Sequence, residues 1–454
     1  MVAWWTAGLA GATSTPFNIT VGAAAGLSFL VQPPNASGGG TLSPAVQVEI
    51  LDAGGNRVTS ASTSVSLTLT SNPSSGTLSG TNPVAAVNGI ATFANLSIDS
   101  AGVGYTLAAS ATGLTGATSA GFDISVGSAA KLAFVVQPSN TSGGAAIAPA
   151  VQVEVQDAGG NRVSIGTYSV VLGIASNPGS GTLSGTTQVS STGGRATFAD
   201  VSINNAGAGY TLSASSSGLS AATSSSFDII VGTATKLAFL AQPTSTTGGV
   251  PIGPAVTVEI QDAGGNRVTD ATNGVTIGIG TNPNSGTLSG TTTVAAAGGL
   301  ATFSTLTIDS AGTGYAFTAS AAGLVGAAST AFNVIVGPPA QLAFRIHPTT
   351  TAGGAIITPA IQVEVRDAGG NHVVGAANTV TVGITSNPND GTLSGTKSAA
   401  AVAGVATFGT LHIDSAGIGY RLGATALGLS GATSNAFNIT VGVPARLGFH
   451  VHPS

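Results

Sequence analysis

The stretch DSAGVGYTL, Asp99 to Leu107, decides the fold that this sequence predicts. It returns as NNAGAGYTL at 204–212, as DSAGTGYAF at 309–317 and as DSAGIGYRL at 414–422. A tyrosine corner places a Tyr near the start of a strand, two residues before a core position, with its hydroxyl bonded back to the backbone. The spacing predicts this structure for Tyr105, Tyr210, Tyr315 and Tyr420, with Leu107 and its counterparts in the core.

The four tyrosines lie 105 residues apart, and no insertion or deletion interrupts this period. A fixed period indicates repeated structural units and overrides a domain count based on length alone. We therefore predict full repeats at 24–128, 129–233, 234–338 and 339–443. Residues 1–23 match the last strands of a repeat and residues 444–454 match the first strand, so we interpret both ends as truncations of a longer protein.

Apolar residues alternate over short runs within each repeat, which is typical of half-buried strands. In the first repeat the expected strands carry Leu27 to Val31, Val46 to Ile50, Val65 to Leu69, Ile90 to Ile98, Tyr105 to Ala109 and Phe122 to Val126. Seven or eight short strands per repeat predict an all-β fold of tandem immunoglobulin-like β-sandwich domains. Linkers of three residues, such as Ser128 to Ala130, favour an elongated rod to which each domain adds roughly 35 to 45 Å.

The composition excludes several classes of partner and site. Charged residues make up 6% of the chain, against roughly 25% in ordinary soluble domains. The 11 Lys and Arg are spread over 454 residues, so we expect no nucleic-acid binding. No apolar run reaches the roughly 18 residues of a membrane span, which predicts no membrane insertion in this segment. Cysteine is absent, which excludes disulfides and thiolate metal sites.

The repeat resembles the bacterial immunoglobulin-like domains found in tandem in invasin- and intimin-type surface adhesins and other large secreted repeat proteins. The resemblance covers almost the whole chain. It rests on the opening with Leu132, Phe134, Val136 and Pro138, on the VEVQDAGGN strand and turn, on Gly89 to Phe93, and on the AGxGYTL strand. The resemblance implies an immunoglobulin-like fold for each repeat and an extracellular or cell-surface location, and it specifies no ligand.

A second recurring stretch concentrates the scarce charge. VEILDAGGNRV, Val48 to Val58, returns with its Asp at 52, 157, 262 and 367. Glu49, Asp52 and Asn56, with Glu154, Asp157 and Asn161 in the next repeat, are the weak candidates for a metal site. A hard cation needs six to eight converging oxygens, and the linkers contain no acidic residue. Asp followed by Gly-Gly-Asn is ordinary turn chemistry, so we interpret the stretch as a turn in which Glu49 points outward.

The remaining candidate residues, the histidines, do not indicate an enzyme active site. His347, His372, His412, His450 and His452 lie in the last quarter, but His347 and His452 stand where other repeats have Gln, which favours polar substitution over a metal pair. No Ser, His and acid arrangement recurs. We predict no catalytic residue, no metal and no cofactor.

Two functions remain. The first is a non-enzymatic structural spacer or stalk in an extracellular or cell-surface adhesin-like protein, whose protein or glycan ligand is unknown. The alternative is that the repeats themselves bind glycans or self-associate as an adhesion or matrix module.

Overall fold

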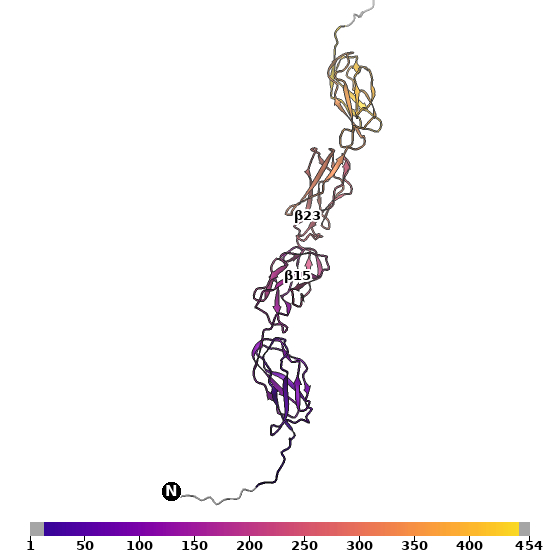
Figure 1. Cartoon of the computed structure of the whole chain (residues 1–454). Coiled ribbons are helices and arrows are strands. Elements are labelled where there is room, and N and C mark those ends of the chain that lie inside the picture. The colour runs from indigo at the N-terminus through magenta and orange to yellow at the C-terminus, as the bar shows by residue number, and fades with distance from the viewer. Residues whose placement is uncertain (1–12, 445–454) are drawn as a thin grey trace, which may run out of the picture. The chain divides into compact units, whose positions relative to one another are not determined.

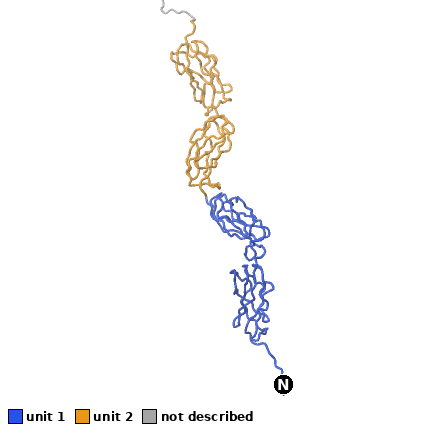
Figure 2. Tube along the Cα trace, turned by 90° about the vertical axis from the view of Figure 1, so that its left-hand side faces the viewer, with its two compact units in different colours: residues 1–230 blue, residues 231–454 orange. Residues whose placement is uncertain are grey.

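The computed structural model describes residues 13–444, and every regular element in this range is a β-strand. The chain divides into two compact units, Met1–Ile230 and Val231–Ser454 (Figure 2). Each unit contains two sets of strands in the same order, and each set falls within one of the predicted repeats. We refer to residues 24–128, 129–233, 234–338 and 339–443 as repeats 1 to 4.

Unit 1 holds repeats 1 and 2. The strands of repeat 1 are β1 (Ala24–Val31), β2 (Ala36–Ser37), β3 (Val46–Asp52), β4 (Ser64–Ser71), β5 (Leu78–Ser79), β6 (Val84–Ala85), β7 (Ile90–Phe93), β8 (Ser97–Ile98), β9 (Gly102–Ser110), β10 (Ala117–Thr118) and β11 (Phe122–Ser125). Those of repeat 2 are β12 (Lys131–Val136), β13 (Thr141–Ser142), β14 (Val151–Gln156), β15 (Ser169–Ser176), β16 (Leu183–Ser184), β17 (Gln188–Ser190), β18 (Arg195–Phe198), β19 (Ser202–Ile203), β20 (Gly207–Ser215), β21 (Ala222–Thr223) and β22 (Phe227–Ile230).

Unit 2 holds repeats 3 and 4. The strands of repeat 3 are β23 (Lys236–Ala241), β24 (Thr246–Thr247), β25 (Val256–Gln261), β26 (Gly274–Thr281), β27 (Leu288–Ser289), β28 (Thr293–Ala295), β29 (Leu300–Phe303), β30 (Thr307–Ile308), β31 (Gly312–Ser320), β32 (Ala327–Ala328) and β33 (Phe332–Ile335). Those of repeat 4 are β34 (Gln341–Ile346), β35 (Thr351–Ala352), β36 (Ile361–Arg366), β37 (Thr379–Ser386), β38 (Leu393–Ser394), β39 (Ser398–Ala400), β40 (Val405–Phe408), β41 (His412–Ile413), β42 (Gly417–Thr425), β43 (Ala432–Thr433) and β44 (Phe437–Thr440).

Each repeat contains two main sheets. In repeat 1 the smaller sheet has the order β1-β3-β7, and the larger has the order β2-β11-β9-β4-β6 with β10 added to β9. The pair β5-β8 stands apart from both, and the same three sheets recur in each of the other repeats (Figure 1). β2 is parallel to β11, and the other pairings in repeat 1 are antiparallel.

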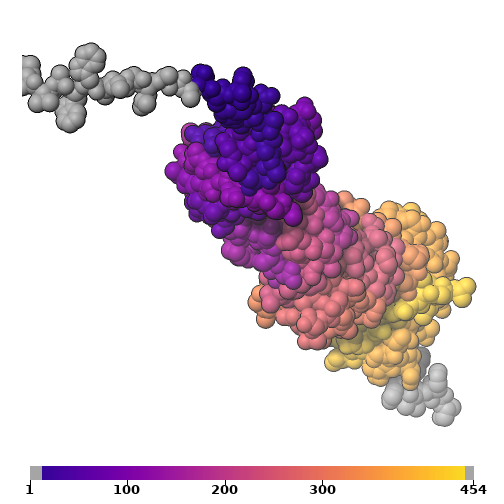
Figure 3. Space-filling model, turned by 90° about the horizontal axis from the view of Figure 1, so that it is seen from below, coloured from indigo at the N-terminus to yellow at the C-terminus, as the bar shows by residue number. Residues whose placement is uncertain are grey.

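The core of each repeat lies between these sheets. β3 alternates buried and half-buried residues along its whole length, with Val46, Val48 and Ile50 inside. The larger sheet contributes Leu67 and Leu107 to the same cluster. The buried apolar residues form four such clusters, one in each repeat. The space-filling view shows the outer surface of the described residues on the face drawn, coloured by residue number (Figure 3).

One predicted strand was wrong in extent. Ile90 to Ile98 was expected to be continuous, but β7 ends at Phe93 and β8 begins at Ser97. The Asn95 side chain between them accepts a hydrogen bond from the Thr81 backbone N–H at 2.8 Å. This contact turns the chain from the smaller sheet toward β5, the partner of β8. The sequence GTLSGT, residues 76–81, which contains β5, therefore pairs with the second part of the expected strand.

The predicted corner tyrosine of each repeat is fully buried, and its hydroxyl donates a hydrogen bond to the carbonyl five residues upstream. The distance is 2.8 Å from Tyr105 to Ser100 and 2.9 Å from Tyr420 to Ser415. Tyr105 also packs on Phe122, with ring centroids 6.1 Å apart. A Cβ on Gly76 would lie 3.0 Å from the Tyr105 hydroxyl, which explains the glycine that begins GTLSGT. These bonds hold the loop 99–105 in one conformation.

Candidate functional site: the joint between successive repeats

The carboxylate of the DAGGN turn binds the linker that enters its own repeat. Asp157 is fully buried, and its Oδ2 accepts a hydrogen bond from the backbone N–H of Gly127 at 2.8 Å. Its Oδ1 accepts the backbone N–H groups of Gly160 and Asn161, both at 2.9 Å. The linker bond recurs at 2.8 Å in every repeat, from Gly22 to Asp52, Gly127 to Asp157, Gly232 to Asp262 and Gly337 to Asp367.

The asparagine of the turn contacts the preceding repeat. The Nδ2 group of Asn161 donates to the carbonyl of Asp99 at 2.7 Å, and its Oδ1 accepts the backbone N–H of Ala101 at 2.8 Å. The same Nδ2 group lies 3.1 and 3.0 Å from the two carboxylate oxygens of Asp157. The loop that Tyr105 holds in place is therefore also the surface on which the next repeat docks. We call this pairing of turn and tyrosine loop the joint.

The two glycines of the turn have different roles in the joint. Gly160 has a φ of +101°, which L side chains rarely adopt. Gly159 has no such constraint, but its N–H donates to the Gly38 carbonyl at 3.1 Å. A Cβ on Gly159 would overlap the Asp99 carbonyl oxygen, and one on Gly38 would overlap Asn161. Gly159 and Gly38 are thus required by the close approach of two backbones.

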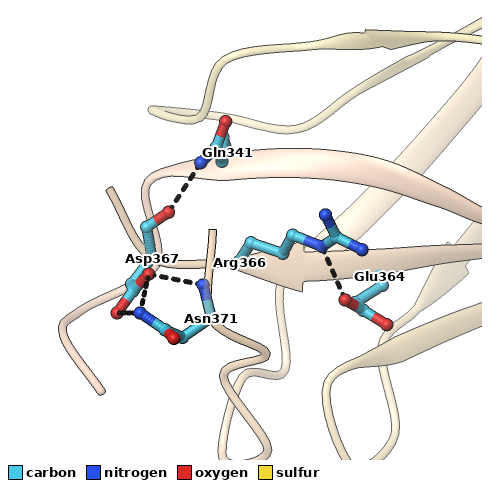
Figure 4. Close-up of polar contacts among 5 residues, drawn as sticks. All are labelled: Gln341, Glu364, Arg366, Asp367 and Asn371. Atoms are coloured by element: carbon cyan, nitrogen blue, oxygen red, sulfur yellow. Dashed lines mark hydrogen bonds and ion pairs between the residues drawn. The ribbon is translucent and has the colours of Figure 1, made fainter. Parts of the chain in front are cut away.

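The joint between repeats 3 and 4, inside unit 2, has the same geometry. Asn371 accepts the N–H of Ala311 and donates to the Asp309 carbonyl, both at 2.7 Å. Its bonds to Asp367 are drawn in Figure 4. Gln341 from the first strand of repeat 4 donates to the Asp367 carbonyl at 2.9 Å and braces the turn from the other side (Figure 4).

The carboxylates proposed as weak metal ligands are engaged elsewhere. Glu49 pairs with Arg57 at 2.9 Å and Glu154 with Arg195 at 3.0 Å. Both oxygens of Asp52 and of Asp157 accept hydrogen bonds from backbone N–H groups. Among residues 13–444 no three His, Asp or Glu side chains are grouped as metal ligands. The Asp52 and Asp157 carboxylates hold the backbone of the linker and of the turn in place. Among the described residues they therefore do not form a cluster of oxygens open to a metal ion.

The glutamates of this stretch are less exposed than an outward position alone would give. Glu49 alternates with the buried Val48 and Ile50 on β3 but is only half-exposed, and its counterpart Glu154 is 7% exposed. Arg195 projects from the neighbouring strand β18, where Glu154 and Arg195 are direct partners across the sheet. The ion pair covers the carboxylate and compensates for its burial.

His347 stands where repeats 1 to 3 have a glutamine, and it makes the hydrogen bond that the glutamine makes there. Its Nδ1 is the acceptor for the backbone N–H of Asn435 at 3.0 Å. In repeats 1 to 3 the Oε1 of Gln32, Gln137 or Gln242 accepts the equivalent N–H at 2.9 Å. This contact fits polar substitution at position 347. His450 and His452 lie outside the described residues.

The turn carboxylate makes the first repeat sensitive to acid. Hydrogen bonds from the N–H groups of Gly22 and Asn56 lower the pKa of Asp52 to about 2, from its ordinary value of 3.8. A lowered folded-state pKa stabilises the fold above the unfolded-state pKa, and this contribution disappears as pH falls through the folded-state pKa. We therefore expect the stability difference between wild type and Asp52→Asn to be constant above pH 4 and to shrink between pH 4 and 2. Urea unfolding at a series of pH values measures it, and a difference that stays constant down to pH 2 would contradict the assignment.

No protein-family model and no curated protein sequence matches this chain. Among solved structures, it is similar to a β-glycosidase from Bacteroides vulgatus, with 15% identity, 46% of this chain and 25% of that chain covered, and a TM-score of 0.20. It is also similar to Escherichia coli α2-macroglobulin activated by porcine elastase, with 11% identity, 92% of this chain and 44% of that chain covered, and a TM-score of 0.24. The chain spans less than half of either protein, and both likenesses are too weak to support an argument.

The described residues also include no helix with the length and apolarity that a membrane crossing requires.

Proposed function

We propose that this chain is a non-enzymatic spacer, built of tandem immunoglobulin-like domains, in an extracellular or cell-surface adhesin-like protein. The observation that supports this proposal is the hydrogen bonding at the joint between successive repeats. A flexible string of domains needs no contact between neighbours, whereas Asn161 and Asn371 each make two hydrogen bonds to the repeat before them. Such contacts restrict the angle between neighbours, which is what a spacer requires and a simple tether does not.

The immunoglobulin-like assignment is supported by two features of each repeat. Two main sheets share one core of alternating apolar residues, and a buried tyrosine at the start of a long strand bonds back to the preceding loop. Antibody domains join their sheets by a disulfide, and this chain has no cysteine. Aliphatic and phenylalanine packing, with Leu107 and Phe93 fully buried, takes over that role.

A spacer is also supported by what varies between repeats. Exposed positions exchange one small residue for another, as at Ser64, Ser169, Gly274 and Thr379, and within the described residues they display no recurring aromatic platform for a sugar. The joint residues, by contrast, are present in each copy of the turn. This pattern favours a role in connecting domains over a role in binding glycans through each domain.

Small-angle X-ray scattering on the full chain tests the proposal. A spacer of four domains is expected to give a maximum dimension of roughly 140 to 180 Å, since each domain adds roughly 35 to 45 Å. A glycan array probed with the same protein tests the alternative. A compact particle in scattering, or strong and selective glycan binding, would overturn the proposal.

A further inference from the structure

In each repeat the segment that enters the domain runs parallel to the segment that leaves it. In repeat 1, β2 lies parallel to β11, and an isolated parallel bridge joins Gly26 to Thr115. The strand pairing and the bridge recur in the other three repeats. We call residues 25–38 of repeat 1 the entry segment, residues 115–125 the exit segment, and the hydrogen bonds between them the ladder.

Two side chains extend the ladder across a stretch that lacks backbone donors. Pro33 and Pro34 of the entry segment have no N–H group. On one side of them, the Oε1 of Gln32 accepts the N–H of Ala120 at 2.9 Å. On the other side, the Oδ1 of Asn35 accepts an N–H of β11 at 2.7 Å. Both bonds join residues that are 88 positions apart, as are the partners in β2 and β11, so side chains and strands share one register.

The contact is kept where the residue type changes. His347 stands in the place of Gln32 in repeat 4, and its Nδ1 accepts the equivalent N–H at 3.0 Å. Ser245 stands in the place of Asn35 in repeat 3, and its hydroxyl oxygen accepts the equivalent N–H, also at 3.0 Å. Common descent of the repeats explains identical residues, but it does not explain why a different side chain makes the same bond. The repeats therefore share the contact itself.

The entry segment is bound to both sheets of its repeat. β1 pairs with β3 in the smaller sheet, and the chain then crosses to the larger sheet, where β2 pairs with β11. β11 in turn pairs with β9 and carries the buried Phe122 and Ile124. The ladder thus connects the two segments through which the chain enters and leaves the domain.

We propose that the ladder makes each repeat resistant to tension along the chain, a load-bearing function that rests on the proposed role as a spacer. Tension reaches a repeat through the linker before its entry segment and the linker after its exit segment. Because the two segments are parallel and are pulled at opposite ends, they must slide along each other, which strains all bonds of the ladder at once. Forced unfolding is governed by the unfolding rate, so bonds that break together slow it more than bonds that break in turn.

Two pulling directions on the same folded repeat test the proposal. The chain has no cysteine, so handles for optical tweezers can be attached to the full chain at introduced cysteines. Thr20→Cys with Ser128→Cys loads the two segments at opposite ends, whereas Thr20→Cys with Thr112→Cys loads them at neighbouring ends, and all three positions are exposed. Repeat 1 is expected to unfold at a clearly higher force with the first pair. Equal forces in the two directions would overturn the proposal.

Removing the side-chain acceptors tests their share of the load. Gln32→Ala with Asn35→Ala deletes two bonds of the ladder, so repeat 1, pulled at opposite ends under constant force, should unfold roughly tenfold faster. Both side chains are exposed, so the repeat should still fold. Asn95→Ala is the matched control, because Asn95 is also exposed and makes two hydrogen bonds with Thr81, outside both segments. It should leave the unfolding rate under tension close to that of the parent protein.

The control decides whether the ladder carries the load. Equal acceleration by the double variant and by Asn95→Ala would contradict the proposal, and so would a double variant that unfolds under tension like the parent protein. Either result would leave the spacer proposal standing, because scattering on the full chain tests that proposal separately.

Discussion

Replacing Asp157 by alanine is expected to lower the free energy of unfolding of repeat 2 by about 3 to 5 kcal/mol, one of the two largest effects that the structure predicts. The carboxylate is fully buried and accepts backbone hydrogen bonds from Gly127, Gly160 and Asn161. Alanine would leave the half-buried N–H groups of Gly127 and Asn161 without this acceptor, and each such loss costs about 1 to 3 kcal/mol. The loss should be partly reduced in Asp157→Asn, which keeps one acceptor oxygen.

Urea unfolding followed by amide hydrogen exchange measures this loss and assigns it to a repeat. Asp270→Ala provides the control, because the Asp270 side chain is exposed, whereas that of Asp157 is fully buried. The control should stay within about 0.5 kcal/mol of wild type. A change of less than about 1 kcal/mol for Asp157→Ala would show that the turn does not depend on its carboxylate.

The second large effect is expected at Tyr105. Tyr105→Ala should destabilise repeat 1 by about 3 to 5 kcal/mol, because it empties the space of a fully buried aromatic ring. Tyr105→Phe keeps the ring on Phe122 and removes only the 2.8 Å hydrogen bond to Ser100, for which we expect about 1 to 2 kcal/mol. The difference between the two variants separates packing from the corner hydrogen bond.

Tyr105→Phe should also act beyond its own repeat. Ser100 lies between Asp99 and Ala101, the two residues whose backbone groups hold Asn161. A looser loop should increase hydrogen exchange at the Ala101 amide while the strands of repeat 1 remain protected. Equal exchange at Ala101 in wild type and Tyr105→Phe would mean that the tyrosine has no part in the joint.

The fold could be anticipated because its signals are local and repeated. Alternating residues such as Val46, Val48 and Ile50 predict a half-buried strand, and the fixed period separates the repeats. The break between β7 and β8 could not be foreseen, because Asn95 ends β7 through a contact with Thr81 that no alternation pattern contains. The burial of Glu154 depends on Arg195, which has an apolar residue at its counterpart positions in the other repeats.

The joint was missed for a different reason. A turn alone explains the Asp, Gly and Asn residues of DAGGN, so these residue types gave no reason to expect that Asn161 contacts another repeat. That partner lies about 60 residues upstream in another repeat. A signal was nevertheless present, because a turn that needs one residue with positive φ contains two glycines in all four copies. The additional glycine, Gly159 in repeat 2, indicates a close approach by another backbone.

The central claim is that the turn of one repeat fixes the angle to the repeat before it. The chain has no cysteine, so spin labels can be attached at Thr68→Cys in repeat 1 and Ser169→Cys in repeat 2, both exposed positions on strands. Pulsed electron spin resonance then measures the distribution of distances between the two repeats. We predict a narrow distribution that broadens clearly in Asn161→Ala, while Asn88→Ala, at an exposed turn, leaves it unchanged. A distribution that is already broad in the parent protein, or one that Asn161→Ala does not widen, would contradict the claim.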